Sequence, residues 1–296
     1  MPQAAMHHPR RRRRNRQKNQ LEDKARMMNP TLLTGRPRIT AAMALALTLA
    51  SAPAQAEKLS LVAKARVFGA TVMTVKLNAN YAGKAYTASA AIIPSDMLAR
   101  MGGYFQNFAT KGMRQGVILK PLSFSMRIRP GNRNETHKTA LVWKSVPRAV
   151  SAPPYMKPHD AAIRRFLTRA TFDPLSMFIN TGNLGGVCKG RFRAYDGFKV
   201  YDLSLKPLGR ATYAGSQYRG PVVKCRATLH QYAGSPPGAN GQSSHYTAWI
   251  VPVKTKTAGL LLVPVKVTGR LSGFNFTAHL HHFSYGGRSL RQLAGR

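Results

Sequence analysis

Three histidines near the C-terminal end come closest to a recognisable chemical site. If residues 273–284 form a strand, His279 and His281 lie on one face and His282 on the other. Two imidazoles so placed could bind a metal ion with a third ligand from a neighbouring strand, but the sequence shows no obvious third ligand. We favour exposed histidines opposite an apolar face, formed by Phe274, Phe276, Ala278 and Leu280. We therefore predict no metal and no cofactor.

Acidic residues are scarce, which limits acid–base chemistry. After residue 56 the chain has only seven Asp and Glu, and Asp196 and Asp202 are the closest in sequence. On one strand they would point to the same face about 20 Å apart, too far to share one bond-breaking event. We interpret them as turn and strand-end residues. The nucleophile elbow, phosphate-binding glycine loops, His-Glu-x-x-His and Cys-x-x-Cys are all missing from the sequence, so no catalytic residue is predicted.

The chain has two cysteines, Cys188 and Cys225. In an oxidising compartment such a pair usually forms a disulfide, and we predict this bond. Closing the loop between them would stabilise the fold by about 3–4 kcal/mol. The alternative is two buried free thiols.

The N-terminal region has the layout of an export signal. An apolar stretch at 41–50 follows Arg36 and Arg38 and precedes the small residues up to Ala56. We predict a signal peptide at 27–56, cleaved after Ala56, and a periplasmic protein. The apolar run is shorter than the roughly 20 residues of a spanning helix, so no transmembrane segment is expected in the mature chain. Residues 1–26, with arginine at 10–14, are a disordered basic leader or a misassigned start, and 57–296 form a single β-rich domain.

The charge balance is strongly basic. The formal net charge is +37, and residues after 56 carry 35 Lys and Arg against seven Asp and Glu, about +28. Such a surface raises the local concentration of anionic partners, which outside the cytoplasm are envelope components. The alternative is that the charge serves solubility. Nucleic acid is not expected, because export removes the usual partner and no binding motif is present.

Alternating apolar and polar residues indicate many half-buried strands. The pattern is clear from Leu59 to Val67, from Met73 to Asn78 and on to Ile93. Further strands fit at 190–206, 211–232, 246–254, 260–271 and 273–284. One strand supplies a candidate apolar concave face, formed by Leu122, Phe124, Met126 and Ile128.

Helical signals are few. Ser95 could cap a helix with Met97, Met101 and Phe105 at four-residue spacing, and a second helix fits 159–170. Asp173 could cap a short third helix with Pro174 at its first position. These patterns predict a mainly β fold: a strongly curved antiparallel sheet, or half-barrel, with two or three short helices at its open side.

Short motifs in the second half carry a family resemblance. They are the run Asp173, Pro174, Leu175, Ser176; Cys188; Tyr195, Asp196, Gly197; Tyr201, Asp202, Leu203; and Cys225. In order and spacing they resemble the alphaproteobacterial members of the domain of unknown function 3108 family. The resemblance implies a secreted β-rich half-barrel without an assigned activity, with Tyr195 to Gly197 as a strand-entry turn. It adds no catalytic residue and does not explain the basicity.

Two functional hypotheses follow, with a third behind them. The first is a non-enzymatic periplasmic protein that binds an apolar, lipid-like ligand or an anionic envelope component. The second is an envelope structural or interaction protein whose sheet is filled by its own helices. They differ in whether Met97, Met101, Phe105, Ile163 and Phe166 cover the concave face or leave a cavity. The third is a hydrolase built from scattered Asp and His residues.

Overall fold

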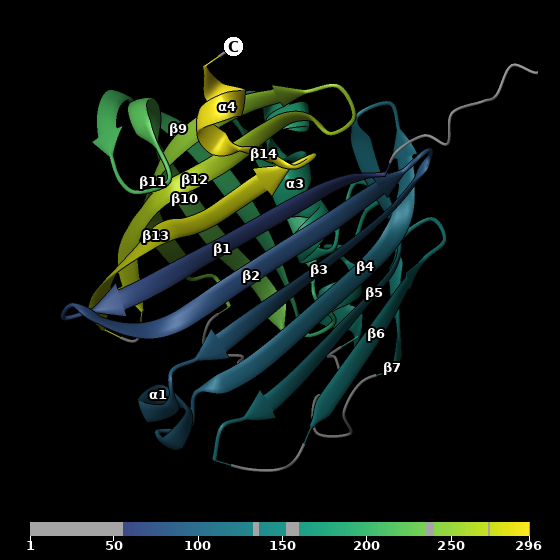
Figure 1. Cartoon of the computed structure of the whole chain (residues 1–296). Helices are drawn as coiled ribbons and strands as arrows, with labels where there is room; N and C mark the ends of the chain where they lie inside the picture. The colour runs from purple at the N-terminus through teal and green to yellow at the C-terminus, as the bar shows by residue number, and fades with distance from the viewer. Residues whose placement is uncertain (1–55, 133–135, 152–159, 235–239, 272, 296) are drawn as a thin grey trace, which may run out of the picture. The chain divides into compact units, whose positions relative to one another are not determined.

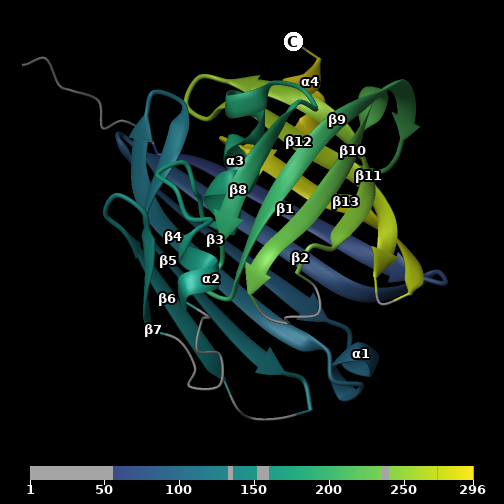
Figure 2. The ribbon, with the colours of Figure 1, turned by 180° about the vertical axis from the view of Figure 1, so that it is seen from behind.

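The fold is built on one long antiparallel sheet (Figures 1 and 2). A computed structural model describes residues 56–132, 136–151, 160–234, 240–271 and 273–295. All of them belong to one unit, Ser51–Arg296. The predicted leader and nearly all of the predicted signal peptide lie outside the described residues. None of the described helices is long and apolar enough to cross a membrane.

Two meanders meet side by side in this sheet. The first consists of β1 (Glu57–Val67), β2 (Ala70–Ala82), β3 (Ala85–Pro94), β4 (Tyr104–Gln115), β5 (Ile118–Pro130), β6 (His137–Trp143) and β7 (Pro147–Ser151). The second consists of β8 (Gly190–Tyr195), β9 (Lys199–Ala214), β10 (Arg219–Gly234), β11 (Ser243–Thr255), β12 (Gly259–Leu271) and β13 (Phe274–Tyr285). Strand β1 pairs with β13, which joins the halves, and the short β14 (Arg288–Ser289) pairs with β13.

Four short helices accompany the sheet in the described part of the chain. They are α1 (Asp96–Arg100), α2 (Asp160–Arg164), α3 (Pro174–Gly185) and α4 (Leu290–Ala294). The prediction of a strongly curved, mainly β antiparallel fold is confirmed. The C-terminal helix α4 was not predicted. Its start has a capping box, in which Ser289 and Gln292 each satisfy the backbone of the other.

Strand alternation places the core on the inner face. On β2 and β3 the buried side chains recur at every second position, as at Leu77, Ala79, Tyr86 and Ala88. Several bulges interrupt the pairing and add twist, for example where Val62 and Ala63 shift against β13. The sheet curves because these extra residues lengthen one strand relative to its neighbour.

The predicted concave face is wrong at one residue because of a bulge in β5. Lys111 pairs with Ser123 and Gly112 with Pro121, so Leu122 is the extra residue of β5. Its side chain is 51% exposed, whereas Phe124 and Met126 are buried. Ile128 is partly buried against the core. Leu122 therefore does not belong to the inner face, because strict alternation breaks at the bulge.

The first predicted helix is shorter than expected. Helix α1 covers one turn after its Ser95 cap, and Phe105 lies in β4. Met97 and Met101 are 59% and 75% exposed, so they do not cover the sheet. The four-residue spacing of Met97, Met101 and Phe105 was therefore a misleading helix signal. The backbone N–H of Gly103 closes the turn by donating to the Leu98 carbonyl.

The two ends of the sheet approach each other without forming a ladder. The indole N–H of Trp143 on β6 donates to the Thr171 carbonyl at 2.9 Å. Phe172 in turn bridges to Ala194 of β8. Gly197, just after β8, lies so close to β6 that an added Cβ would sit 2.2 Å from a methyl of Thr139. The sheet is thus nearly closed by side-chain and loop contacts.

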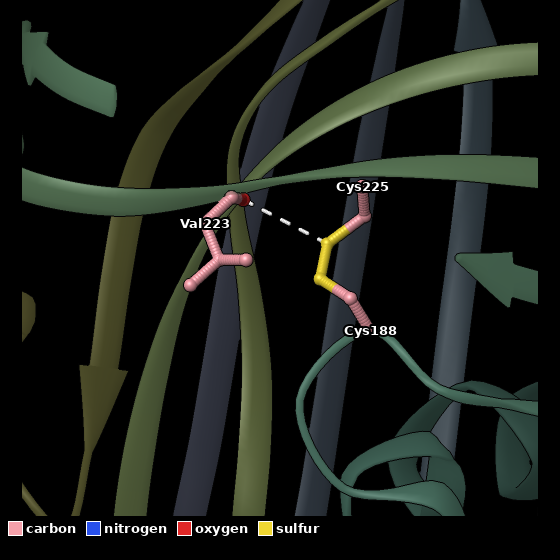
Figure 3. Close-up of a disulfide and its surroundings, with 3 residues drawn as sticks. All are labelled: Cys188, Val223 and Cys225. Carbon is pink, nitrogen blue, oxygen red and sulfur yellow. Dashed lines mark hydrogen bonds between the residues drawn. A yellow bond between two sulfur atoms is a disulfide. The ribbon is translucent and has the colours of Figure 1, made fainter. Parts of the chain in front are cut away.

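A disulfide ties the loop after α3 to β10 (Figure 3). Cys188 and Cys225 have Cα atoms 5.6 Å apart, and both residues are completely buried. Cys225 Sγ also contacts the Val223 carbonyl oxygen at 3.7 Å. The predicted disulfide is confirmed. It fixes the end of the helix that lies inside the sheet.

Candidate functional site

A cavity of about 660 Å³ lies between the inner faces of the two meanders and helix α3. One wall is apolar and comes from β1 to β5, with Leu61, Leu77, Ile92, Phe108 and Met126. The opposite wall is also apolar and comes from β9 to β12, with Leu203, Leu205, Leu229, Ile250 and Leu262. Helix α3 adds Leu175, Met177 and Phe178. Both the volume and the lining are those of a small-molecule site.

Polar lining residues gather where the strands of the second half start or end. Lys199 begins β9 and pairs with Gly234, the last residue of β10. Gln231 near the end of β10, Gln242 just before β11 and Ser244 at the start of β11 also line the cavity, and the Gln231 N–H donates to the Gln242 carbonyl at 3.1 Å. Gln242 and Ser244 are exposed, so this end of the cavity meets solvent. We call it the polar end.

Asp196 is a carboxyl group buried at the polar end. It lies in the turn between β8 and β9, and its Oδ1 accepts hydrogen bonds from the backbone N–H groups of Phe198 and Lys199, both at 2.9 Å. Gly197 has φ of 95°, which an L side chain rarely adopts, so Asp-Gly suits this turn. Burial raises the pKa of Asp196, although the Lys199 ammonium and the backbone hydrogen bonds oppose the shift.

Tyr201 places a neutral hydroxyl group in the same cavity. Burial raises the pKa of its phenol well above the usual value, and the nearby carboxyl groups of Asp196 and Asp173 raise it further. The Lys199 ammonium lies 5.9 Å from the centre of the Tyr201 ring. In the described part of the chain no group hydrogen-bonds to the Tyr201 hydroxyl. This phenol can therefore donate to a ligand inside the cavity.

A buried hydrogen-bond network holds α3 against the first meander. Asp173 caps the helix, accepting from the N–H groups of Leu175 and Ser176, and also accepts from the Thr110 hydroxyl at 3.1 Å and the Ser176 hydroxyl. The Tyr86 hydroxyl lies 2.6 Å from the Ser176 hydroxyl oxygen. Burial raises the pKa of Asp173, while its hydrogen bonds oppose the shift. This carboxyl group has a structural task, because its acceptor sites are used within the protein.

Asparagines of α3 fasten the helix to both halves of the sheet. Asn180 exchanges two hydrogen bonds of 2.8 Å with the backbone of Leu119 on β5. Asn183 donates to the carbonyls of Val117 and Ala258 and accepts from the N–H of Leu260 on β12. The polar groups on this buried helix are thus satisfied, and the cavity wall that it forms has a fixed position.

The structure separates Asp202 from Asp196 more completely than predicted. Tyr201, Leu203 and Leu205 of β9 line the cavity, so Asp202 points to the opposite face. There it forms ion pairs with Arg191 at 2.6 Å and Arg193 at 2.8 Å. The expectation that both carboxylates share a strand face is wrong, because Asp196 lies in the turn before β9 begins.

The histidines also deviate from the predicted pattern. His279 pairs with Lys64 and His282 with Val62, two residues on the same face of β1, because His281 is the extra residue of a bulge. His279 and His281 line one small outer pocket. No three His, Cys, Asp or Glu side chains converge as metal ligands in the ranges that the structure describes. The metal hypothesis therefore has no third ligand there.

The cavity wall that β9 forms was not predicted from the sequence. The alternation of Lys199, Tyr201, Leu203 and Leu205 marks the inner face of β9 and could have been read as a lining. Of the helical residues expected to fill the sheet, Ile163 is buried. Phe166 packs against the core. They leave the cavity open.

Three comparisons relate the chain to known proteins. The family model described as "Protein of unknown function (DUF3108)" matches residues 61–268. A β-barrel-like protein of domain of unknown function DUF1849 from Brucella abortus is similar in structure, with a TM-score of 0.41 and 9% identity over 78% of this chain and 97% of the other. A DUF1329 family protein from Desulfovibrio piger has a TM-score of 0.24 and 9% identity over 78% and 85%. None of the curated proteins matches the chain.

Proposed function

The chain belongs to the DUF3108 family of proteins of unknown function, and from that premise we propose that it is an exported, non-enzymatic protein that binds a lipid-like molecule in its sheet cavity. The observation that carries the proposal is the apolar cavity of about 660 Å³ with one polar end. Apolar walls favour a hydrocarbon body through the hydrophobic effect, and a few polar groups fix its orientation.

The ligand is an amphiphile in this proposal. Its apolar part would lie between Phe108, Met126, Leu203 and Leu229, and its polar part at the solvent-exposed end. There the Tyr201 hydroxyl can donate a hydrogen bond, and Lys199 supplies a positive charge. A molecule that is apolar throughout would leave these polar groups without a partner.

Export to the periplasm is part of the proposal. It is supported by the apolar stretch at 41–50 and by the disulfide, since disulfides persist in oxidising compartments. Strand β1 begins at Glu57, the first residue after the predicted cleavage site. The excess of Lys and Arg would attract anionic envelope components to the outer surface.

The alternative is a structural or docking protein whose sheet is filled by its own helices. Helix α3 does fill part of the interior and is buried for much of its length. The remaining cavity favours the ligand hypothesis, since Met97 and Met101 lie exposed outside it.

A cavity-filling variant tests the proposal. Ala90 lines the cavity from β3 and pairs with Leu77 and Phe108, so the ring of Ala90→Phe occupies ligand space. Its neighbour Ser89 is exposed on the outer face, which makes Ser89→Phe a matched control on the same strand. If the ring displaces two methylene groups, the loss is roughly 1.6 kcal/mol, or about 15-fold in Kd.

Binding is measured by fluorescence titration with cis-parinaric acid, a long-chain fatty acid. We expect saturable binding by the wild type and by Ser89→Phe, and weaker binding by Ala90→Phe. Tyr201→Phe removes only the hydroxyl group. It should weaken the binding of the fatty acid more than the binding of the matching hydrocarbon. Equal affinity of both Phe variants on β3, with folding intact by circular dichroism, would refute the cavity as the binding site.

A further inference from the structure

A second pocket lies on the outer face of the sheet, away from the cavity. It has a volume of about 250 Å³ and lies between β1, β13 and the turn that follows β9. Strands β1 and β13 run next to each other in Figure 1. The lining side chains that can carry charge or donate are Lys64, Arg66, Tyr213, Ser216, His279 and His281.

The pairing of the strands explains why these side chains converge. Lys64 is directly opposite His279, and Arg66 is two residues further along the same face of β1. The bulge in β13 inserts His281 as an extra residue, and such bulges redirect side chains. From β12, Lys266 pairs with His279 on its other side. Basic side chains of the two neighbouring strands, β1 and β12, therefore flank His279.

Tyr213 completes the pocket from the end of β9. Its hydroxyl oxygen lies 3.1 Å from Nδ1 of His279, and the two rings stack with centroids 6.5 Å apart. An added Cβ at Gly215 would lie 2.5 Å from the Tyr213 hydroxyl, so glycine leaves room for this contact. With the hydroxyl as donor, the neutral imidazole carries its proton on Nε2, where it is available to a ligand.

The charges in this pocket are not balanced by acid groups. In the part of the chain that the structure describes, the ion pairs join Asp202 to Arg191 and Arg193, on other strands. The pKa of His279 is lowered by burial first and then by the positive charges of Lys266 and Arg66. Burial disfavours a charge of either sign, but the positive charges of Lys266 and Arg66 repel a metal cation as they repel a proton, and they attract an anion.

We propose that this outer pocket binds a phosphate group, through Lys64 and Arg66 with His279 as a neutral donor. An arginine fork and a lysine ammonium are the usual phosphate ligands in proteins, and charge-assisted hydrogen bonds are the strong ones. The phosphate belongs to a lipid headgroup or is free in solution. Phosphate is thus the anionic group that an envelope component would present, and this pocket is where it would bind. Such binding does not depend on occupation of the cavity.

Paired charge-removal variants test the site. Lys64→Gln/Arg66→Gln removes two charges from the pocket. Lys111→Gln/Arg127→Gln removes two exposed charges from β4 and β5, outside the pocket. Binding of inorganic phosphate is measured by isothermal titration calorimetry at constant low ionic strength. The pocket variant should raise Kd at least about tenfold, since it loses two charge-assisted contacts, and the control variant less than about twofold.

Vesicles distinguish the two sources of phosphate. Co-sedimentation is measured with phosphatidylglycerol vesicles, and phosphatidylcholine vesicles report binding that needs no net negative charge. Binding of phosphatidylglycerol vesicles that is lost with Lys64→Gln/Arg66→Gln, without binding of inorganic phosphate, supports a lipid headgroup. Binding of inorganic phosphate alone supports a free phosphate.

Two results would overturn the proposal. One is an equal loss in both double variants, because total charge would then explain binding. The other is no binding of either probe by the wild type. The titration with cis-parinaric acid should be unchanged in Lys64→Gln/Arg66→Gln, so failure of this site is distinguishable from failure of the cavity proposal.

Discussion

Removing the disulfide should lower stability by a calculable amount. Cys188 and Cys225 are 37 positions apart, and in the chain-entropy model closing such a loop stabilises the fold by about 3.8 kcal/mol at 25 °C. Domains of this kind have total stabilities of roughly 5–15 kcal/mol. The bond therefore accounts for a large share, and the variant Cys188→Ala/Cys225→Ala should remain folded but be much less stable.

Urea unfolding followed by tryptophan fluorescence measures the change. Trp143 on β6 and Trp249 on β11 report on both halves of the sheet. With a slope of about 2–3 kcal/mol per molar urea, the midpoint should fall by roughly 1.3–1.9 M. The slope itself should rise, because the unfolded chain without the cross-link exposes more surface.

Reduced wild type is the control that separates the cross-link from the lost sulfur atoms. It should unfold close to the alanine variant if the cross-link dominates. A difference below about 1 kcal/mol between oxidised and reduced wild type would refute the reasoning. That result would mean that the packing of α3 holds the loop without the covalent bond.

Three further changes address the inner network and the turn before β9. Tyr86→Phe removes the 2.6 Å hydrogen bond to Ser176. It should lower the free energy of unfolding, measured with urea, by about 1–2 kcal/mol. Gly197→Ala combines a positive φ with a clash against Thr139, so its melting temperature should fall by several degrees, about 2–4 °C per kcal/mol. Because burial raises the pKa of Asp196 in the folded state, its contribution to stability is largest at acid pH and decreases as pH rises above about 4. Asp196→Asn should flatten that part of the stability–pH profile.

Strand alternation made the sheet predictable from the sequence. Leu59 to Val67 and Met73 to Ile93 show period-two patterns because one face of each strand is buried. The disulfide was predictable because two cysteines allow one pairing. The alternation is visible within each strand, and the pairing follows from the number of cysteines. Neither prediction requires knowledge of the tertiary fold.

The bulges could not be predicted from the sequence. Leu122 continues an apolar alternation, yet a one-residue shift against β4 turns it outward. The extra residue His281 likewise brings His282 to the face of His279. A bulge depends on the length match between neighbouring strands, which no single strand reveals.

The cavity was anticipated only as one of two alternatives. The cavity exists because α3 fills only part of the interior. Asn180 and Asn183 fix the position of the helix by binding backbone groups of residues far away in the sequence. Tyr201 and Gln242 come to line the same cavity because Gln231 of β10 pairs with Tyr201 and bonds to the Gln242 carbonyl. Such contacts between residues far apart in sequence carry no local pattern.

Native mass spectrometry of the untagged protein, purified from the periplasmic fraction without reductant, tests both export and ligand binding. We expect a chain that begins at Glu57 and carries one bound amphiphile of lipid size. The fraction of protein with this additional mass should be unchanged in Ser89→Phe and lower in Ala90→Phe. A mass without bound ligand in the wild type, together with no binding of added fatty acid, would contradict the proposed ligand binding.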